Sequence, residues 1–387
     1  MTASRKHLDA FFALLRAGLF PIHGEGVPDI RIDETTDWNV VYRLAQEQSV
    51  QGLALQGIEE LKAKGIELSV PKTLLLQWIG EVQMIEHRNK GMNAFIAKLI
   101  TRLREADIYT LLVKGQGIAQ CYEKPLWRSC GDVDLLLSES NYKKAKACLY
   151  EIASSVEPEE FVSKHLGFTI DSWVVELHGH MYFGLLPKVD KVIHETERNI
   201  LYLGEIRVWN NDGVDVYLPR PDEDIIIIFT HFLGHFCFGG VGVRQLCDLC
   251  RLLWVYRKEI NRGLLKKRLC EMGLMSEWEV FAVLSVDSLG MPADAMPFYN
   301  QSKFTKIKAQ RACDRLIRSG NLGHKFDDSY RERLPKWQSS FITLQRRVSE
   351  LFSLMSIIPL KAPVFFVNYL ISKKVIAKAK KDGYYPG

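Results

Sequence analysis

The chain has 387 residues, of which 47% are hydrophobic and 25% are charged, and its formal net charge is +5. This composition excludes a largely disordered chain, and so mild a charge argues against a long nucleic-acid-binding track. The eight cysteines show no spacing typical of a small disulfide framework, and residues 1–9 lack an apolar segment with a cleavage site. We therefore expect a cytoplasmic protein with reduced thiols.

The first hundred residues are predicted to be helical. Apolar residues recur at helical spacing over residues 7–19, 38–61 and 74–103, and prolines and glycines mark the first loop at residues 21–28. We assign residues 1–102 to an N-terminal helical region.

A strand and a glycine-bearing turn follow. Residues 109–113 are apolar enough for a buried strand, which runs into Lys114-Gly115-Gln116-Gly117 and then a helical turn at residues 118–122. A strand, a glycine turn and a helix N-terminus present free backbone N–H groups where a phosphate can sit, with Lys114 as a positive charge beside them.

The most informative motif is Asp132-Val133-Asp134, directly before the apolar run Leu135-Leu136-Leu137. Residues i and i+2 of a strand point to the same face, so both carboxylates can aim at one point while Val133 and Leu135 point into the core. Such a pair suits Mg²⁺ between triphosphate oxygens. Taken alone, an Asp-x-Asp is also common as a merely solvated strand end.

A third acid follows on a later strand. Residues 167–178 are predicted to form a hairpin that turns at Asp171-Ser172, and on its second strand Glu176 and His178 share a face. A third carboxylate near the first two would complete a cluster that holds two metal ions, or holds one and deprotonates an attacking hydroxyl.

The remaining elements complete an α+β pattern. A helix is predicted at 140–152, and a hairpin at 206–218 turns at residues 211–213. Helices are then predicted from residue 223, at 245–257, at 263–272 and at 275–289. We expect a small mixed sheet over residues 103–220, a C-terminal helical region over 221–345 and an apolar, basic tail over 346–387.

These motifs resemble a nucleotidyltransferase family of bacterial proteins within the DNA polymerase β-like nucleotidyltransferase superfamily. The matching stretches are Lys114-Gly115, Arg128, Gly131-Asp132-Val133-Asp134 and Val175-Glu176-Leu177-His178, with weaker likeness through Asp248. The resemblance implies a mixed sheet flanked by helices and the transfer of a nucleoside monophosphate from an NTP to a hydroxyl-type acceptor. The glycine-serine pair usual in that superfamily is absent, and Lys114-Gly115-Gln116 stands in its place.

Site roles follow from the resemblance. Asp132, Asp134 and Glu176 would be the catalytic residues and would bind Mg²⁺ or Mn²⁺. Lys114, Gly115, Gln116, Arg128 and His178 would contact the NTP. The acceptor, a small molecule, a protein or an RNA end, is not specified by one chain.

Two rival functions come from other classes of protein. The first is a non-catalytic scaffold that binds a nucleotide or a partner, at a membrane surface through its tail. The second is a metallohydrolase that uses His178, His180, His231 and His235, of which the last two lie four residues apart on a predicted helix.

Two other sequence patterns, a pair of cysteines and a pair of charged residues, can be explained by structure alone or by a site. Cys247 and Cys250 have Cys-x-x-Cys spacing without a second pair, which favours core cysteines. Arg244 and Asp248 are spaced for an i,i+4 ion pair, either on a helix surface or in the wall of a nucleotide pocket.

The tail carries an apolar stretch at residues 351–371, which Pro359, Lys361 and Pro363 interrupt and which basic residues flank. The interruptions argue against a transmembrane helix. Packing on the protein itself is favoured over docking to an anionic membrane or to a partner.

Overall fold

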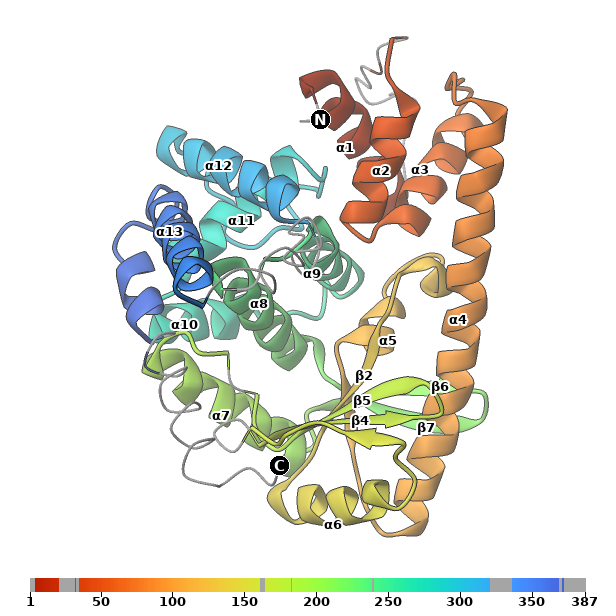
Figure 1. Cartoon of the computed structure of the whole chain (residues 1–387), viewed down its shortest axis with the longest axis vertical. Helices are drawn as coiled ribbons and strands as arrows, with labels where there is room; N and C mark the ends of the chain where they lie inside the picture. The colour runs from red at the N-terminus through yellow and green to blue at the C-terminus, as the bar shows by residue number, and fades with distance from the viewer. Residues whose placement is uncertain are drawn as a thin grey trace.

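The computed structural model describes residues 4–20, 32, 35–160, 164–181, 183–238, 240–320, 336–368 and 371. A small mixed sheet lies at one end of the molecule, and helices from both the N-terminal and the C-terminal parts of the chain cover it (Figure 1). The predicted α+β class is confirmed.

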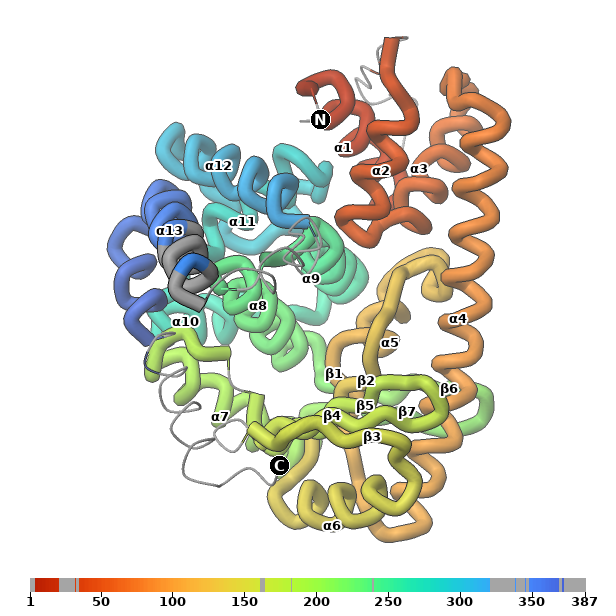
Figure 2. The backbone as a smooth tube through the Cα atoms, in the orientation of Figure 1, coloured from red at the N-terminus to blue at the C-terminus, as the bar shows by residue number. Residues whose placement is uncertain are grey.

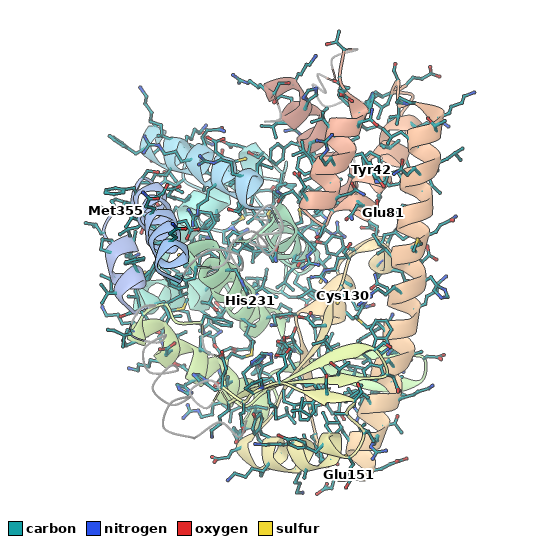
Figure 3. All side chains as sticks on the ribbon, viewed as in Figure 1. Tyr42, Glu81, Cys130, Glu151, His231 and Met355 are labelled. Atoms are coloured by element: carbon teal, nitrogen blue, oxygen red, sulfur yellow. The ribbon has the colours of Figure 1, made fainter. Side chains whose placement is uncertain are left out.

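Four helices open the chain. They are α1 (Arg5–Leu19), α2 (Trp38–Glu47), α3 (Gln51–Ala63) and α4 (Lys72–Glu105). With 34 residues, α4 is about 50 Å long at 1.5 Å per residue, so it reaches from these helices to the far side of the sheet (Figure 1). Near its start it is tied to α2, where the Tyr42 hydroxyl donates a hydrogen bond to Glu81 (Figure 3).

Residues 38–61 are helical, as their periodicity predicted, but the structure divides them between α2 and α3. Ser49 has a positive φ of 54°, which no helix interior allows. Next to it the buried Gln48 side chain donates to the carbonyl of Leu316 and accepts from the N–H of Val243, at 3.3 and 2.8 Å. These hydrogen bonds to residues distant in the sequence stabilise the break between α2 and α3, which the local hydrophobic periodicity does not predict.

The five-stranded sheet has the order β1-β2-β5-β4-β3, in which β2 and β5 are parallel and the other pairs antiparallel. Its strands are β1 (Leu111–Val113), β2 (Asp132–Leu136), β3 (Ser155–Val156), β4 (His165–Ile170) and β5 (Trp173–His178). Between them lie α5 (Gly115–Ala119), the 3₁₀ helix η1 (Pro125–Trp127) and α6 (Glu139–Tyr150). A separate hairpin pairs β6 (Ile206–Asn211) with β7 (Val214–Pro219), as predicted.

The second half of the described chain is mainly helical. Its helices are α7 (Pro187–Tyr202), α8 (Pro221–Phe238), α9 (Val243–Val255), α10 (Arg262–Met272), α11 (Met275–Asp287), α12 (Lys303–Ser319) and α13 (Lys336–Met355). Figure 2 shows this group beside the sheet, with α7 and α8 nearest to it.

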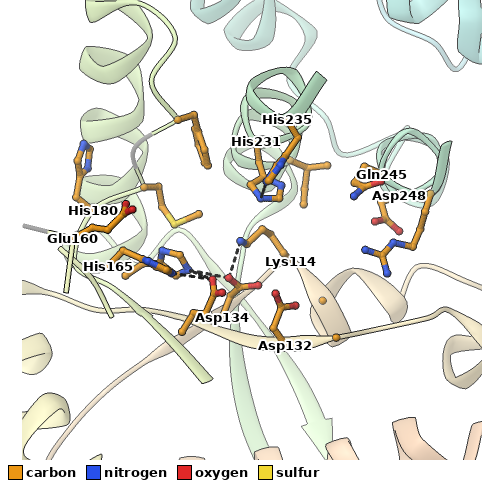
Figure 4. A pocket seen from close by; sticks show the side chains of 18 of the residues that line it. Lys114, Asp132, Asp134, Glu160, His165, His180, His231, His235, Gln245 and Asp248 are labelled. Carbon is orange, nitrogen blue, oxygen red and sulfur yellow. Dashed lines mark hydrogen bonds and ion pairs between the residues drawn. The ribbon is translucent and has the colours of Figure 1, made fainter. Parts of the chain in front are cut away.

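One face of the sheet is apolar and buried, and the other is polar and forms part of a candidate site. Val133, Leu135, Val175 and Leu177 are at most 1% exposed and pack with α4 and α6 in one hydrophobic cluster. The other face carries the acidic residues of β2 and β5 and looks toward α8 and α9 (Figure 4). A larger cluster joins α1–α3 with α7–α12, so the N-terminal and C-terminal helices share a core.

The described part of the tail packs on the protein itself. Five of its side chains are at most 4% exposed: Leu354, Ile357, Ile358, Ala362 and Phe365. Asn368 donates to the carbonyl of Leu185 at 2.8 Å, and Lys361 pairs with Glu277. Among the residues that the structure places, no helix has the length and hydropathy needed to cross a membrane. The basic residues 373–381 lie outside the described residues.

Candidate active site

A pocket of about 500 Å³ opens where the polar face of the sheet meets α8 and α9 (Figure 4). Its floor is formed by residues at the start of β2 and the end of β5. Its opposite wall is formed by α8 and α9, which contribute Ile228, His231, His235, Arg244, Gln245 and Asp248.

Three carboxylates converge on the floor of this pocket. In the parallel pairing of β2 with β5, Asp134 lies directly beside Glu176, and Asp132 lies two residues earlier on the same face. One carboxylate oxygen from each of the three lies within 4.8 Å of the others. The side chain of Asp134 is only 2% exposed, so the solvated strand end considered from sequence does not describe it.

The acidic cluster fits a divalent metal ion. The negative charge of Asp134, and then burial, raises the pKa of Asp132 to about 6. Such repulsion between carboxylates is relieved when a cation binds between them, and carboxylate oxygens are the ligands that Mg²⁺ and Mn²⁺ prefer. Among the residues described, Asp134 Oδ2 has no hydrogen-bond partner and is available as a ligand.

Lys114 lies directly above the acids. It lies between β1 and α5 with a φ of 59°, and its Nζ is 2.7 Å from Asp134 Oδ1. Burial opposes its charge, but attraction to the carboxylates, Asp134 first, outweighs burial and raises the pKa of the ammonium group. Gly115 follows with a φ of 40°, and a Cβ there would lie 3.2 Å from Cys130 Sγ. Glycine therefore lets this turn approach β2 closely.

Two histidines fix the third acid. His165 Nε2 is 3.0 Å from Glu176 Oε2, and His178 Nε2 is 3.5 Å from the same oxygen and 2.8 Å from Asp134 Oδ1. Burial alone would raise the pKa of Glu176, but the hydrogen bonds from both imidazoles outweigh it and hold that pKa well below its usual range. Glu176 is therefore ionised at neutral pH.

His165 was not predicted as a site residue, although the sequence contains a signal that places it there. The hairpin that turns at Asp171-Ser172 pairs residues at equal distances from the turn, and counting outward sets His165 opposite His178. The predicted turn was correct, so the register follows from it.

Arg128 is part of the pocket wall but is already paired. Its Nε and Nη2 donate to the two oxygens of Asp248 at 2.9 and 2.6 Å, and its Nη1 donates to the carbonyl of Ser129 at 3.1 Å. Tyr122 donates to Asp248 as well, at 2.8 Å. The suggested ion pair between Arg244 and Asp248 was wrong, because Asp248 pairs with Arg128 instead.

Arg244 is left facing the pocket with most of its donors free. Its Nη1 donates to the carbonyl of Ser129 at 2.7 Å, while its Nε is buried without a partner among the described residues. Burial lowers the pKa of this guanidinium, but an arginine side chain remains charged in proteins at neutral pH. Of the two predicted places for Arg244, a helix surface or the wall of a nucleotide pocket, the structure has the pocket wall. Nothing in the local sequence predicts that its donors are left free there.

Gln116 points the other way. It is 1% exposed, and its Nε2 donates to Asn89 Oδ1 at 2.9 Å on α4. Its side chain therefore helps to anchor the turn to α4 and is not part of the pocket lining.

His231 and His235 face Lys114 across the pocket (Figure 4). Their Nε2 atoms are 3.1 Å apart, and burial lowers the pKa of both, which keeps them neutral near pH 7. In the described part of the chain, neither belongs to a group of three metal-competent ligands. The four-histidine metallohydrolase site is therefore not assembled.

Cys247 and Cys250 are fully buried on α9, and neither forms a disulfide. Burial raises the pKa of Cys250 to about 12, so its thiol is unreactive at neutral pH. The interpretation as core cysteines agrees with these positions.

A mixed sheet that presents an Asp-x-Asp pair and a third acid beside a glycine turn has the design of a nucleotidyltransferase. The comparison with protein families supports this class: a family described as an uncharacterised nucleotidyltransferase matches residues 34–286, more than half of the chain. The protein belongs to this family. No curated protein and no solved structure matches the chain.

Family membership supports nucleotidyl transfer as the general activity and an NTP as the substrate. It also agrees with the resemblance found in the sequence motifs. Nucleotidyltransferases generally use divalent metal ions, and the acidic cluster supplies groups able to hold them.

Proposed function

We propose that the protein is a Mg²⁺- or Mn²⁺-dependent nucleotidyltransferase that moves a nucleoside monophosphate from an NTP to a hydroxyl-type acceptor. The observation that carries the proposal is the convergence of Asp132, Asp134 and Glu176 within 4.8 Å on the floor of a pocket of about 500 Å³. A pocket of that size is in the range of small-molecule sites.

Asp132 and Asp134 hold the metal, and Glu176 completes the ligand set. A divalent ion held by these residues would neutralise charge on the triphosphate and on the leaving pyrophosphate. The lowered pKa of Glu176 suits a permanent anionic ligand. The proton of the acceptor hydroxyl passes to a carboxylate of the cluster as the oxygen bonds to the α-phosphorus and the bond to pyrophosphate breaks.

Lys114 and Arg244 supply positive charge to the phosphates from two sides of the pocket. Lys114 bonds Asp134, and Arg244 lies on α9 with an unpartnered buried Nε. A planar guanidinium fits phosphate oxygens with two parallel hydrogen bonds. Arg128 supports this wall through its pairing with Asp248 and does not itself take the phosphates.

The proposal is tested by incubating the purified protein with α-labelled NTPs, Mg²⁺ or Mn²⁺, and pools of small molecules, RNA or protein as acceptors. Label should move to one acceptor class with the wild type. It should not move with the Asp132→Asn/Asp134→Asn variant, whereas the exposed Asp294→Asn control should retain transfer. Equal labelling by the wild type and the double variant would overturn the assignment.

One observation favours the scaffold as a second candidate. Asp134 Oδ1 already accepts hydrogen bonds from both Lys114 and His178, so the acid is partly neutralised by the protein itself. A scaffold of this kind would bind NTP without metal and without turnover. Equilibrium binding of NTP with and without Mg²⁺ separates the candidates, since the transferase requires tighter binding with the ion.

A further inference from the structure

A second group of potential metal ligands lies on α7, apart from the acidic cluster. His194 and Glu197 are one turn apart on this helix, and His180 comes from the segment between β5 and α7. One ligand atom from each lies within 4.8 Å of the others. None of the three belongs to the Asp132–Asp134–Glu176 cluster.

Both imidazoles are turned toward the same carboxylate. His180 Nδ1 is 2.9 Å from each oxygen of Glu197, and His194 Nδ1 is 3.4 Å from Oε2. The two rings are stacked, with centroids 3.8 Å apart and planes only 3° from parallel. In a tetrahedral zinc site with bonds near 2.0–2.1 Å, neighbouring ligand atoms lie about 3.3–3.5 Å apart. An imidazole binds a metal ion in the plane of its ring, so the two rings would rotate out of their parallel stack for these three atoms to reach one ion.

The carboxylates of Glu197 and Asp190 favour the binding of a cation at this group. Glu197 is 6% exposed, and one of its oxygens also accepts the backbone N–H of Met181 at 2.5 Å. Asp190, one turn before His194, has a buried Oδ1 without a hydrogen-bond partner among the residues the structure places. Across that same part of the chain, no lysine or arginine forms an ion pair with Glu197 or Asp190.

We propose that His180, His194 and Glu197, with Asp190 as a neighbouring fourth group, bind one divalent ion of the zinc class. Two imidazoles and a carboxylate are a ligand set for zinc and similar transition metals, whereas the all-carboxylate cluster on the sheet suits Mg²⁺. The two sites therefore differ in the metal that each selects. This inference does not depend on the proposed transferase activity.

The position of the site gives it a structural effect. His180 lines the pocket, whereas the side chain of His194 is 64% exposed on the outer side. An ion between them would tie the segment after β5, and with it a wall of the pocket, to α7. The other histidine group, His165–Glu176–His178, shares Glu176 with the acidic cluster and belongs to the site already described.

The test is a metal titration of the full-length protein after chelator treatment, in excess Mg²⁺ to occupy the acidic cluster. Zn²⁺ affinity is measured by competition with a chromophoric chelator, and Co²⁺ serves as a spectroscopic probe. The wild type should bind one tight equivalent of Zn²⁺, and its Co²⁺ form should show visible absorption bands. In His194→Asn the affinity should fall by at least about 100-fold, as for loss of a ligand or its support. Because His194 is exposed, the variant should fold.

The controls locate the ion. His87→Asn, an exposed histidine on α4, should leave the tight equivalent unchanged, and so should His165→Asn and Asp132→Asn/Asp134→Asn. Glu197→Gln keeps an acceptor for the Met181 N–H but should lose the ion. The proposal is overturned if the wild type binds no tight equivalent, if the equivalent persists in both His194→Asn and Glu197→Gln, or if it depends on His165.

Discussion

Two arginines in the same wall of the pocket are expected to have different roles because their partners differ. Arg128 is bonded to both oxygens of Asp248, with both side chains less than 10% exposed. Arg244 has no acidic partner within ion-pair distance in the described chain and keeps a buried, unpartnered Nε. We infer that Arg128 stabilises the fold and that Arg244 binds the ligand.

Arg244→Met should weaken NTP binding by about tenfold or more, since a charge-assisted hydrogen bond contributes roughly 1.5–3 kcal/mol. The free energy of unfolding should change little, because among the residues that the structure describes only the bond to Ser129 is lost. Isothermal titration with NTP and Mg²⁺ measures the effect, and the exposed Arg318→Met serves as the matched control. Unchanged affinity in Arg244→Met would remove this residue from the phosphate site.

Arg128→Met should instead destabilise the protein by about 3–5 kcal/mol, because it leaves the buried carboxylate of Asp248 without its counter-charge. Urea unfolding measures the loss. Adding Asp248→Asn should recover part of it, since the amide can still accept from Tyr122 and the unpaired carboxylate charge is removed. If the loss of stability in the double variant equals the sum of the losses in the two single variants, the broken Arg128–Asp248 ion pair is not the cause of the destabilisation.

Asp132 should make the protein less stable as the pH rises. Its pKa is raised to about 6 in the folded chain from 3.8, so between these values the folded state binds more protons than the unfolded state. Stability therefore falls as the pH rises through this window. In chelator, Asp132→Asn should be more stable than wild type at pH 7 by about 1–2 kcal/mol, after allowance for partial exposure, and the gain should vanish below about pH 4.

Added Mg²⁺ should reverse that order. It should stabilise the wild type and not Asp132→Asn, with the effect fading as the pH falls below about 6, since a protonated carboxyl is a poor ligand. Thermal unfolding with Mg²⁺ and with chelator across pH 4–8 gives both readings. An Asp132→Asn variant that is equally stabilised by Mg²⁺ would place the ion elsewhere.

At the scale of elements, the β4–β5 hairpin positions His165, Glu176 and His178, and its turn is strained. Asp171 and Ser172 have φ values of 48° and 70°, as in a type I′ turn. Glycine adopts such angles without cost at the second position, so Ser172→Gly should stabilise the protein by about 0.5–1 kcal/mol. Ser140→Gly, in the first turn of α6, should have the opposite sign, and urea unfolding compares the two. A destabilised Ser172→Gly would contradict the turn assignment.

The sequence predicted the elements around the site better than the contacts between them. The Asp-x-Asp strand, the hairpin at Asp171-Ser172 and the third acid follow from period-2 alternation and turn residues, and the structure has them at those places. The break at Ser49 and the choice of Asp248 by Arg128 depend on partners 120 or more residues away. No local pattern carries that information.

At the scale of the whole molecule, helices from both ends of the chain form one core above the sheet. Arg251 on α9 is 2% exposed and donates to the carbonyl of Cys121 at 2.7 Å and to that of Leu19 at the end of α1. Arg16 on α1 donates to the carbonyl of Ser288 at 3.3 Å. From the sequence pattern we predicted region boundaries near residues 102 and 221. In the structure, helices before the first boundary and helices after the second pack in one hydrophobic core.

This arrangement places the pocket between the sheet, which carries the acids, and α8 and α9, which carry Arg244 and the two neutral histidines (Figure 4). The sheet residues are those that the motifs identified. The residues of the opposite wall come from the part of the chain where the resemblance was weakest, and only the packing of the helices brings them to the acids. The identity of the acceptor is expected to depend on that wall.

Nucleotidyl transfer is distinguished from other phosphate chemistry by the separate fates of the α- and γ-phosphates of the NTP. The purified protein is incubated with Mg²⁺, an acceptor pool and either α-labelled or γ-labelled NTP, and both the acceptors and the released pyrophosphate are analysed. We expect the α-label on an acceptor, the γ-label only in pyrophosphate, and neither signal with Asp134→Asn. Transfer of the γ-label to the acceptor, or transfer that persists in Asp134→Asn, would contradict the proposed function.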